Sequence, residues 1–372
     1  MKSFRRLIIV FIFLALLTVN CNAVSGDELQ KDIDLSKLYD TVDDTYKEYL
    51  PDIEKTESIQ DYDINSFAEL LGVVFSKCFP DIKELLGNLL CTVFGLSIIN
   101  AAKGNISSRF FSETIDFLST VISISLGYGL ISDTLYLALN FIDSTKVFIT
   151  ALAPVSALLF TLGGNVSTAV VSSSGLTFLI TLTELFITEV ILPTVKICFG
   201  MSIVGCVGKH SGILKFSSSI KKIFLTLLSG TVSVFGIFLV YKCNLSATAD
   251  TFAARTVKFA GSFIPIIGSP LGESLKSIMS GLDLIKHSVG VLGILIISVI
   301  TLPVILSILL RIFCINISIG VASLLGGEEY IKIFEEFASL LSFIFAVVCC
   351  TCVLMILGLT IPITISPALG GG

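Results

Sequence analysis

The stretch TAVVSSSGLTFLITLTELFITEVILPTVKICFGMSIVGCVG, residues 168–208, contains three charged residues in 41 positions. About 20 apolar residues are enough to cross a bilayer as a helix. As one helix this stretch would be about 60 Å long, twice the thickness of the hydrocarbon core. We therefore expect it to fold back at least once, as two spans at 168–188 and 190–208.

The rest of the chain is similarly apolar. Hydrophobic residues make up 54% of the 372 residues, charged residues only 14%, and the mean hydropathy is +0.95. Soluble domains have about 25% charged residues, so this composition indicates an integral membrane protein. We expect an all-α polytopic transmembrane bundle of seven to nine spans with re-entrant or interfacial segments. The expected spans are 85–102, 114–132, 147–162, 168–188, 190–208, 223–241, 288–308, 309–325 and 338–362.

The N-terminal region has a different composition. Three basic residues precede an apolar run and a short segment of small residues, which is typical of a secretory signal peptide at 1–23. An uncleaved membrane anchor is the alternative. The next segment, 24–64, contains 13 acids and 4 bases. We expect it to be an acidic extracytoplasmic arm that precedes a polytopic membrane domain at 65–372.

Lysines suggest an orientation for the bundle. The segment 208–222 contains four lysines and no acid, and the positive-inside rule places it in the cytoplasm. Counting spans backward places the acidic arm outside. Counting forward places the acidic segment 328–337 outside and the C-terminus in the cytoplasm, with Arg311 at an inner turn. The segment 242–286 then becomes an external apolar loop, too long for a simple connection.

The sequence contains no signature of catalysis. HExxH, GxSxG and Walker motifs are absent, and the two histidines are far apart. We expect no enzyme activity and no catalytic, cofactor-binding or metal-binding residues. The CCTC sequence at 349–352 has no nearby His or carboxylate, which favours helix packing over metal binding. The chain has no basic stripe of the kind that nucleic acid requires, so lipid is the expected non-protein partner.

Charged residues within the expected spans are candidates for a functional site. A charge at the bilayer centre costs about 2.5–3.5 kcal/mol on insertion scales, so it usually faces a partner or water. Glu184 and Lys196 are the expected intramembrane polar residues. Glu189 is expected at an outer turn between two spans. Glycine pairs such as GYG at 127–129 indicate either close helix packing or helix breaks.

One segment resembles a known family. ATADTFAARTVKFAGSFIPIIGSPLGESL (247–275) is similar to the hallmark segment of the stage III sporulation protein AE family of endospore-forming bacteria. The similarity continues in order through ALAPVSALLFTLGGNVSTAVV (151–171), KHSVGVLGILIISVITLPVI (286–305) and ASLLGGEEYIKIFEEF (322–337). The family motif residues, expected in a docking or re-entrant loop or as a brace for the bundle, are Arg255, Lys258, Phe259, Phe263, Pro265 and Gly268.

The resemblance implies a role in endospore formation. The chain would be an integral component of a secretion-like channel complex in the mother-cell membrane around the forespore, needed for forespore development and late forespore gene expression. Its partners would be other stage III sporulation A proteins, including a secretion-type ATPase, and stage II sporulation protein Q across the intermembrane space. Two alternatives remain: a stand-alone small-molecule or ion permease that uses Glu184 and Lys196, and a scaffold that conducts nothing.

Overall fold

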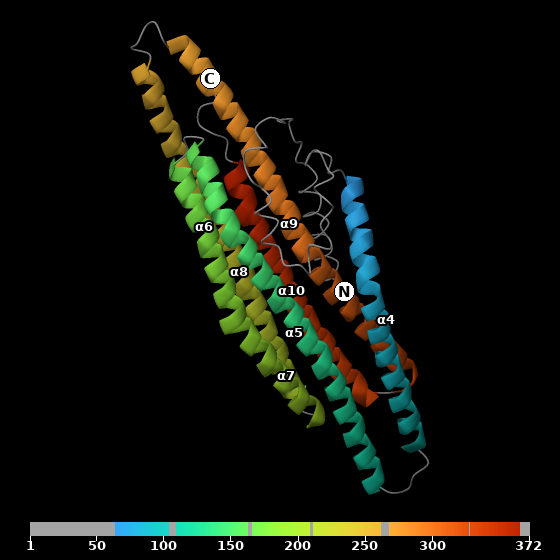
Figure 1. Cartoon of the computed structure of the whole chain (residues 1–372). Helices are drawn as coiled ribbons and strands as arrows, with labels where there is room; N and C mark the ends of the chain where they lie inside the picture. Colours follow the sequence, from blue (N-terminus) through green and yellow to red (C-terminus); the bar gives the residue numbers. More distant parts are fainter. Residues whose placement is uncertain are drawn as a thin grey trace.

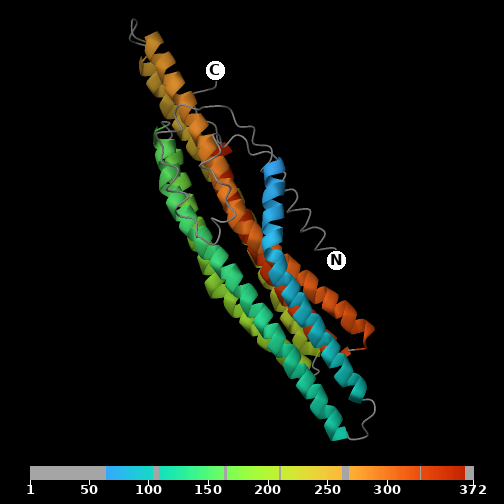
Figure 2. The same ribbon diagram turned by 45° about the vertical axis from the view of Figure 1, so that its right-hand side comes forward.

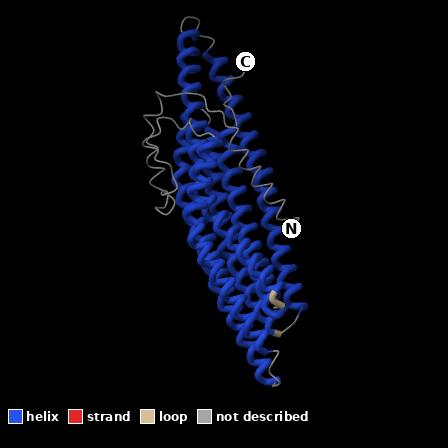
Figure 3. Tube along the Cα trace, turned by 90° about the vertical axis from the view of Figure 1, so that its right-hand side faces the viewer, coloured by secondary structure: helices blue, strands red, loops and turns tan. Residues whose placement is uncertain are grey.

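The computed structural model describes residues 64–103, 109–162, 166–208, 211–261, 268–326 and 328–364. Within these ranges the chain forms helices and short turns and contains no strand, which confirms the all-α class (Figure 3). The expected signal peptide and all of the expected acidic arm except Ile64 lie outside the described residues. The elements are α4 (Ile64–Lys103), α5 (Arg109–Leu162), α6 (Val166–Leu185), the π-helix η3 (Phe186–Ile191), α7 (Leu192–Val207), α8 (Ser211–Gly261), α9 (Gly268–Leu324) and α10 (Glu328–Thr364).

Helix α5 runs without a break through two segments that we expected to be separate spans. Its 54 residues extend about 81 Å at 1.5 Å per residue. The expectation of a turn between 114–132 and 147–162 is therefore wrong. The intervening sequence, 133–146, contains no Gly or Pro and includes three leucines, which favour a helix. Pro154 lies inside α5 without ending it.

The stretch 168–208 also stays helical. Helix α6, η3 and α7 follow one another directly from Val166 to Val207, so the expected fold-back does not occur. Pro193 comes directly after the π turn, as the second residue of α7, and it has no backbone N–H to donate within the continuous helical path. The wider π turn just before it changes the register of the helix without reversing its direction. The resulting helical path is about 63 Å long.

Six helices in the described residues are long and apolar enough to cross a membrane. The predicted count of seven to nine spans is not confirmed, because expected spans merge in α5, in α6–α7 and in α9. In α9 the expected spans 288–308 and 309–325 merge into one helix that ends at Leu324. The candidate spans are Gly72–Ala101, Phe110–Leu158, Ala169–Val207, Gly212–Phe238, Ile296–Leu324 and Tyr330–Ile356.

Helices α9 and α10 form the centre of the bundle (Figures 1 and 2). In the most apolar stretches of these two helices 61% and 67% of the residues are buried, against 17% to 33% in the other four spans. Phe334 and Phe337 of α10 and Phe148 of α5 are fully buried in the core. The surrounding helices expose large apolar side chains such as Phe117 and Ile237. An apolar surface of this extent is suited to contact with lipid.

The ends of the helices correct our expected topology. Helices α4, α7 and α9 finish, and α5, α8 and α10 begin, at the end drawn lower in Figure 1, which we call the lower end. The segments 208–222 and 328–337 therefore lie at the same end of the bundle, although we expected them on opposite sides of the membrane. The count failed because α9 continues through Arg311, where we expected a turn.

The start of α4 and the finish of α10 both lie toward the upper end of the bundle (Figures 1 and 2). If all six candidate helices cross the membrane, the two boundaries of the membrane domain lie on the same side of it. This arrangement does not fit the expected topology, in which the acidic arm is outside and the C-terminus is in the cytoplasm.

The segment 242–286, expected as a loop, is largely helical. Helix α8 continues to Gly261 and α9 begins at Gly268, and both extend beyond the rest of the bundle at the upper end (Figure 1). No proline interrupts the sequence between Lys242 and Pro265. The alanines in this sequence favour a helix, so the apolar composition that suggested a re-entrant loop belongs mainly to helix ends.

Candidate functional site

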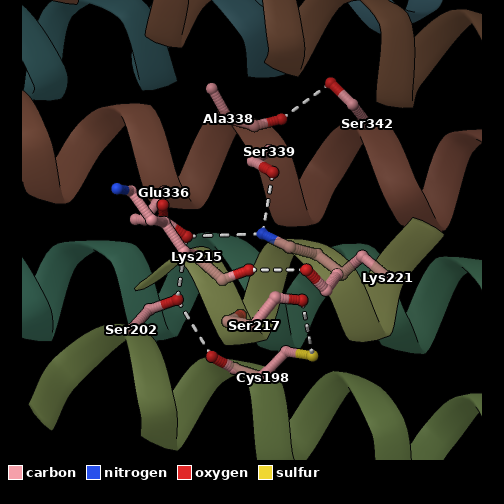
Figure 4. Close-up of polar contacts among 10 residues, drawn as sticks. Cys198, Ser202, Lys215, Ser217, Lys221, Glu336, Ala338, Ser339 and Ser342 are labelled. Atoms are coloured by element: carbon pink, nitrogen blue, oxygen red, sulfur yellow. Dashed lines mark hydrogen bonds and ion pairs between the residues drawn. The ribbon is translucent and has the colours of Figure 1, made fainter. Parts of the chain in front are cut away.

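Lys221 of α8 is held in a polar cluster inside the bundle. The residue is only 5% exposed. Its ammonium donates to the Ser339 hydroxyl at 2.7 Å and to a Glu336 carboxylate oxygen at 3.3 Å, and Ser202 donates to the same oxygen at 3.2 Å (Figure 4). Lys221 and Glu336, which we call the inner pair, thus connect α8 to α10, and Ser202 adds α7 to the same cluster.

The periodicity of α8 explains why Lys221 is buried. Ser217, Leu228 and Phe235 lie four residues before and seven and fourteen residues after it, and all three are buried. The neighbouring Lys222 is exposed. Lys221 faces the core and is shielded from water, unlike Lys222. Its charge therefore requires a carboxylate and hydrogen-bond partners within the bundle.

Aromatic rings pack beside the inner pair. Phe199 of α7 stacks on Phe337 of α10 with ring centroids 5.7 Å apart, and Tyr128 of α5 lies 5.8 Å from Phe199. Gly127 allows α5 to approach this layer, because a Cβ there would lie 1.8 Å from the Phe337 ring. Of the two explanations for the GYG sequence, the structure supports close packing at Gly127.

A second lysine–carboxylate pair joins α5 to α6. The Lys146 ammonium lies 2.6 Å from a Glu184 carboxylate oxygen, and the two side chains are 41% and 47% exposed. We call it the outer pair. It lies about 24–27 Å below the upper ends of these two helices, at 1.5 Å per residue. A charge at such a distance from a helix end usually has a partner, and the ion pair supplies one.

The structure does not bring together the two predicted intramembrane residues, Glu184 and Lys196. Lys196 is exposed on α7, about 18 Å further along the same helical path, and has no ion-pair partner among the described residues. Glu189 is not at a turn but in η3, where it is exposed. The partner of Glu184 is Lys146, which lies 38 residues earlier in the chain.

Arg311 lies within α9 instead of at the inner turn where we expected it. Its guanidinium donates to the Thr134 hydroxyl of α5 at 3.1 Å. Asp133 of α5 and Asp81 of α4 are the acidic residues that act on it electrostatically. Arg311 therefore connects the central helix α9 to α5, with acids from two helices around it.

The family motif residues lie toward the upper end. Arg255, Lys258 and Phe259 are in the last turns of α8, and Gly268 is the first residue of α9. Phe263 and Pro265 lie outside the described residues. The motif is therefore placed on two helix ends, remote from both lysine–carboxylate pairs.

The cysteines form no cluster with metal-binding side chains in the part of the chain that the structure describes. Cys349, Cys350 and Cys352 are free thiols of α10, and Cys352 is buried. At these positions the small thiol side chains contribute to packing.

Sequence comparison extends over nearly all of this bundle. The family profile described as Stage III sporulation protein AE (spore_III_AE) matches residues 46–366. The chain belongs to the stage III sporulation protein AE family. It is 26% identical over 309 residues to Stage III sporulation protein AE of Bacillus subtilis (strain 168), an alignment that covers 80% of this chain and 75% of the relative. No solved structure matches the chain.

The inner pair was missed by sequence analysis, although α8 contains a signal for it. Lys221 shares the seven-residue spacing of Leu228 and Phe235, which indicates a position on the buried face. The sequence assigned Lys221 to a cytoplasmic loop because its neighbours include other lysines. No comparable signal identifies Lys146 as the partner of Glu184, since the register of two antiparallel helices depends on packing.

Proposed function

We propose that this chain is an integral membrane component of the channel complex between mother cell and forespore, required for forespore development and late forespore gene expression. The observation that carries the proposal is the family match over residues 46–366, which includes all six candidate spans. A function shared by the family would therefore reside in the membrane bundle as a whole. The proposal includes no catalytic step.

The distribution of lysines supports one orientation in the mother-cell membrane. Lys103, Lys215 and Lys332 lie near the lower ends of their helices, and basic residues near helix ends favour the cytoplasm. The upper end would then face the intermembrane space. The acidic arm, the ends of α8 and α9 and the finish of α10 would all be on that side.

On this orientation the family motif would face partner proteins. Arg255 and Lys258 provide positive charge on α8 at the upper end, where other stage III sporulation A proteins and stage II sporulation protein Q would assemble. The secretion-type ATPase would act from the cytoplasmic side. Charge reversal at Arg255 and Lys258 should reduce complex assembly at unchanged protein level, and normal assembly and spores would remove the docking role.

A clean in-frame deletion in the host tests the function as a whole. The cells are followed through starvation by membrane-stained microscopy and by counts of heat-resistant spores. We expect arrest after engulfment with small or collapsed forespores and unchanged vegetative growth, restored by the wild-type chain at another locus. Normal spore counts would contradict the proposed function.

A stand-alone small-molecule or ion permease is the second candidate. The outer pair favours it, because both charged side chains are partly exposed in membrane helices. Substrate uptake into vesicles that contain only the purified chain would support this function. Sporulation arrest without any uptake by the isolated chain would favour the complex.

A further inference from the structure

The outward surface of α5 and α6 has a polar strip within two membrane helices. On both helices, exposed or partly exposed polar residues recur every three or four positions, which is the spacing of one helix face. On α6 and the following η3 these residues are Ser174, Thr177, Thr181, Glu184 and Thr188. On α5 they are Tyr136, Asn140, Asp143, Lys146 and Thr150. Together we call them the polar strip.

The outer pair shows that the two rows of residues meet. The 2.6 Å contact between Lys146 and Glu184 connects α5 to α6 at the middle of the strip. The hydroxyls of Thr177 and Thr181 donate to backbone carbonyls of their own helix at 3.0 Å, which satisfies them internally. Asp143 is different, because it is exposed and has no hydrogen-bond or ion-pair partner in the described ranges.

The position of Asp143 makes contact with lipid unfavourable. It lies one turn below the outer pair, and both helices continue upward through the apolar segments 147–162 and 166–183. The lipid hydrocarbon cannot solvate a carboxylate. By contrast, the segments 223–241 of α8 and 337–362 of α10 contain no charged residue. The polar strip therefore needs a covering partner that is not lipid.

We propose that the polar strip is the interface with a second copy of this chain. The strip contains carboxylates and an ammonium at one depth, so it is complementary to itself. A two-fold axis along the membrane normal would bring the same residues of two copies together at that depth. Lys146 of each copy can then pair with the unpartnered Asp143 of the other, while Glu184 and the hydroxyls complete a polar contact between helices.

The position of α5 and α6 in the bundle leaves room for this contact. The upper part of α5 packs against α6, and there the two helices lie on the side of the bundle away from α4 (Figures 1 and 2). The central helices α9 and α10 are buried behind the surrounding helices. A second copy could cover the strip without disturbing the core, and this inference does not rest on the proposed role in sporulation.

Site-specific photocross-linking tests the interface in the full chain. A photoreactive phenylalanine derivative replaces Tyr136 on the strip or, as the matched control, Val234 on α8; both residues are 67% exposed. After illumination of native membranes, we expect Tyr136 to give a product near twice 39.9 kDa that contains two differently tagged copies, and Val234 to give none. The proposal would be overturned if the photoreactive residue at position 136 cross-linked to a different protein. It would also be overturned if neither position gave a cross-linked product.

The charge pairing is tested separately. Asp143→Asn is introduced into the chain that carries the photoreactive residue at position 136. This change keeps the size of the side chain and removes the charge that would meet Lys146 of the second copy. We expect most of the dimer product to be lost at equal protein level, whereas Lys196→Met on α7 should leave it unchanged. Equal dimer yields in wild type and Asp143→Asn would contradict the proposed interface.

Discussion

Two lysine–carboxylate pairs of similar chemistry have very different surroundings in this bundle. The inner pair, Lys221 and Glu336, has side chains 6% and 18% exposed, and two serines complete its hydrogen bonds. The outer pair, Lys146 and Glu184, has side chains 41% and 47% exposed. The shorter contact belongs to the outer pair, at 2.6 Å against 3.3 Å.

The comparison suggests that burial, more than the distance between the charged atoms, sets how much stability is lost when one partner of a pair is removed. A buried ion loses its hydration, so the loss of its partner is costly. A lysine on the outer surface of the bundle is not enclosed by protein and can extend toward the membrane interface or toward a new partner, so the loss of its carboxylate costs less. We conclude that the inner pair fixes the packing of three helices, whereas the outer pair belongs to a surface available for assembly.

The largest decrease in the free energy of unfolding is expected when the charge of Glu336 is removed. Glu336→Gln leaves the Lys221 ammonium buried without a carboxylate, which should lower the free energy of unfolding by about 3–5 kcal/mol. Unfolding of the purified chain in mild detergent measures the difference. Glu335→Gln is the matched control, because the adjacent Glu335 is exposed. Equal stabilities of the two variants would contradict a structural role for the inner pair.

Replacing both members of the inner pair sharpens this test. In Lys221→Met with Glu336→Leu no charge is left buried, so the double variant should be more stable than Glu336→Gln. The same unfolding measurement applies. A double variant that is no more stable than the single one would mean that the cost arises from packing and not from the unpaired charge.

The next effect tests how tightly the helices pack beside the inner pair. Gly127→Ala would place a methyl group within 1.8 Å of the Phe337 ring, and such overpacking should cost about 1–3 kcal/mol. Gly129→Ala, two residues away, meets nothing within 4 Å and should have little effect. Thermal unfolding in detergent compares the two. Equal midpoints would show that the Phe337 ring moves aside at little cost.

The smallest effect is expected at the outer pair. Glu184→Gln should lower the free energy of unfolding in detergent less than Glu336→Gln does, because the remaining Lys146 side chain is 41% exposed and is not enclosed by the bundle as Lys221 is. The measurement is the same as for Glu336→Gln. A loss as large as that of the inner pair would show that Lys146 and Glu184 stabilise the single bundle, and our distinction between the two pairs would be lost.

Composition indicated an integral membrane protein, because 14% charged residues is well below the roughly 25% of soluble domains, and the described residues include six helices long and apolar enough to cross a membrane. Helix ends were harder to predict. Asp133, Asp143 and Arg311 interrupt apolar runs and therefore suggested the ends of spans. Each nevertheless lies inside a continuous helix. Charged residues suggest a turn only when they reach water, and here neighbouring helices provide partners for some of them.

The candidate sites were only partly visible in the sequence. Glu184 was correctly singled out as a charged residue of a membrane helix, but its partner depends on the register between α5 and α6. Lys221 and Glu336 were assigned to opposite sides of the membrane, although they form an ion pair. We expected a turn at Arg311, but α9 continues through this residue. For that reason all segments after Arg311 were assigned to the wrong side relative to α8.

A reporter fused to the C-terminus tests the six-span account most directly. Alkaline phosphatase becomes active only outside the cytoplasm, where its disulfides form, whereas a fluorescent reporter folds inside. With the lysine-bearing lower end in the cytoplasm and six spans, we predict an active phosphatase and a dark fluorescent fusion at the C-terminus. An inactive phosphatase with a bright fluorescent fusion would mean either that the upper end faces the cytoplasm or that the number of spans is odd, and either result would contradict the account.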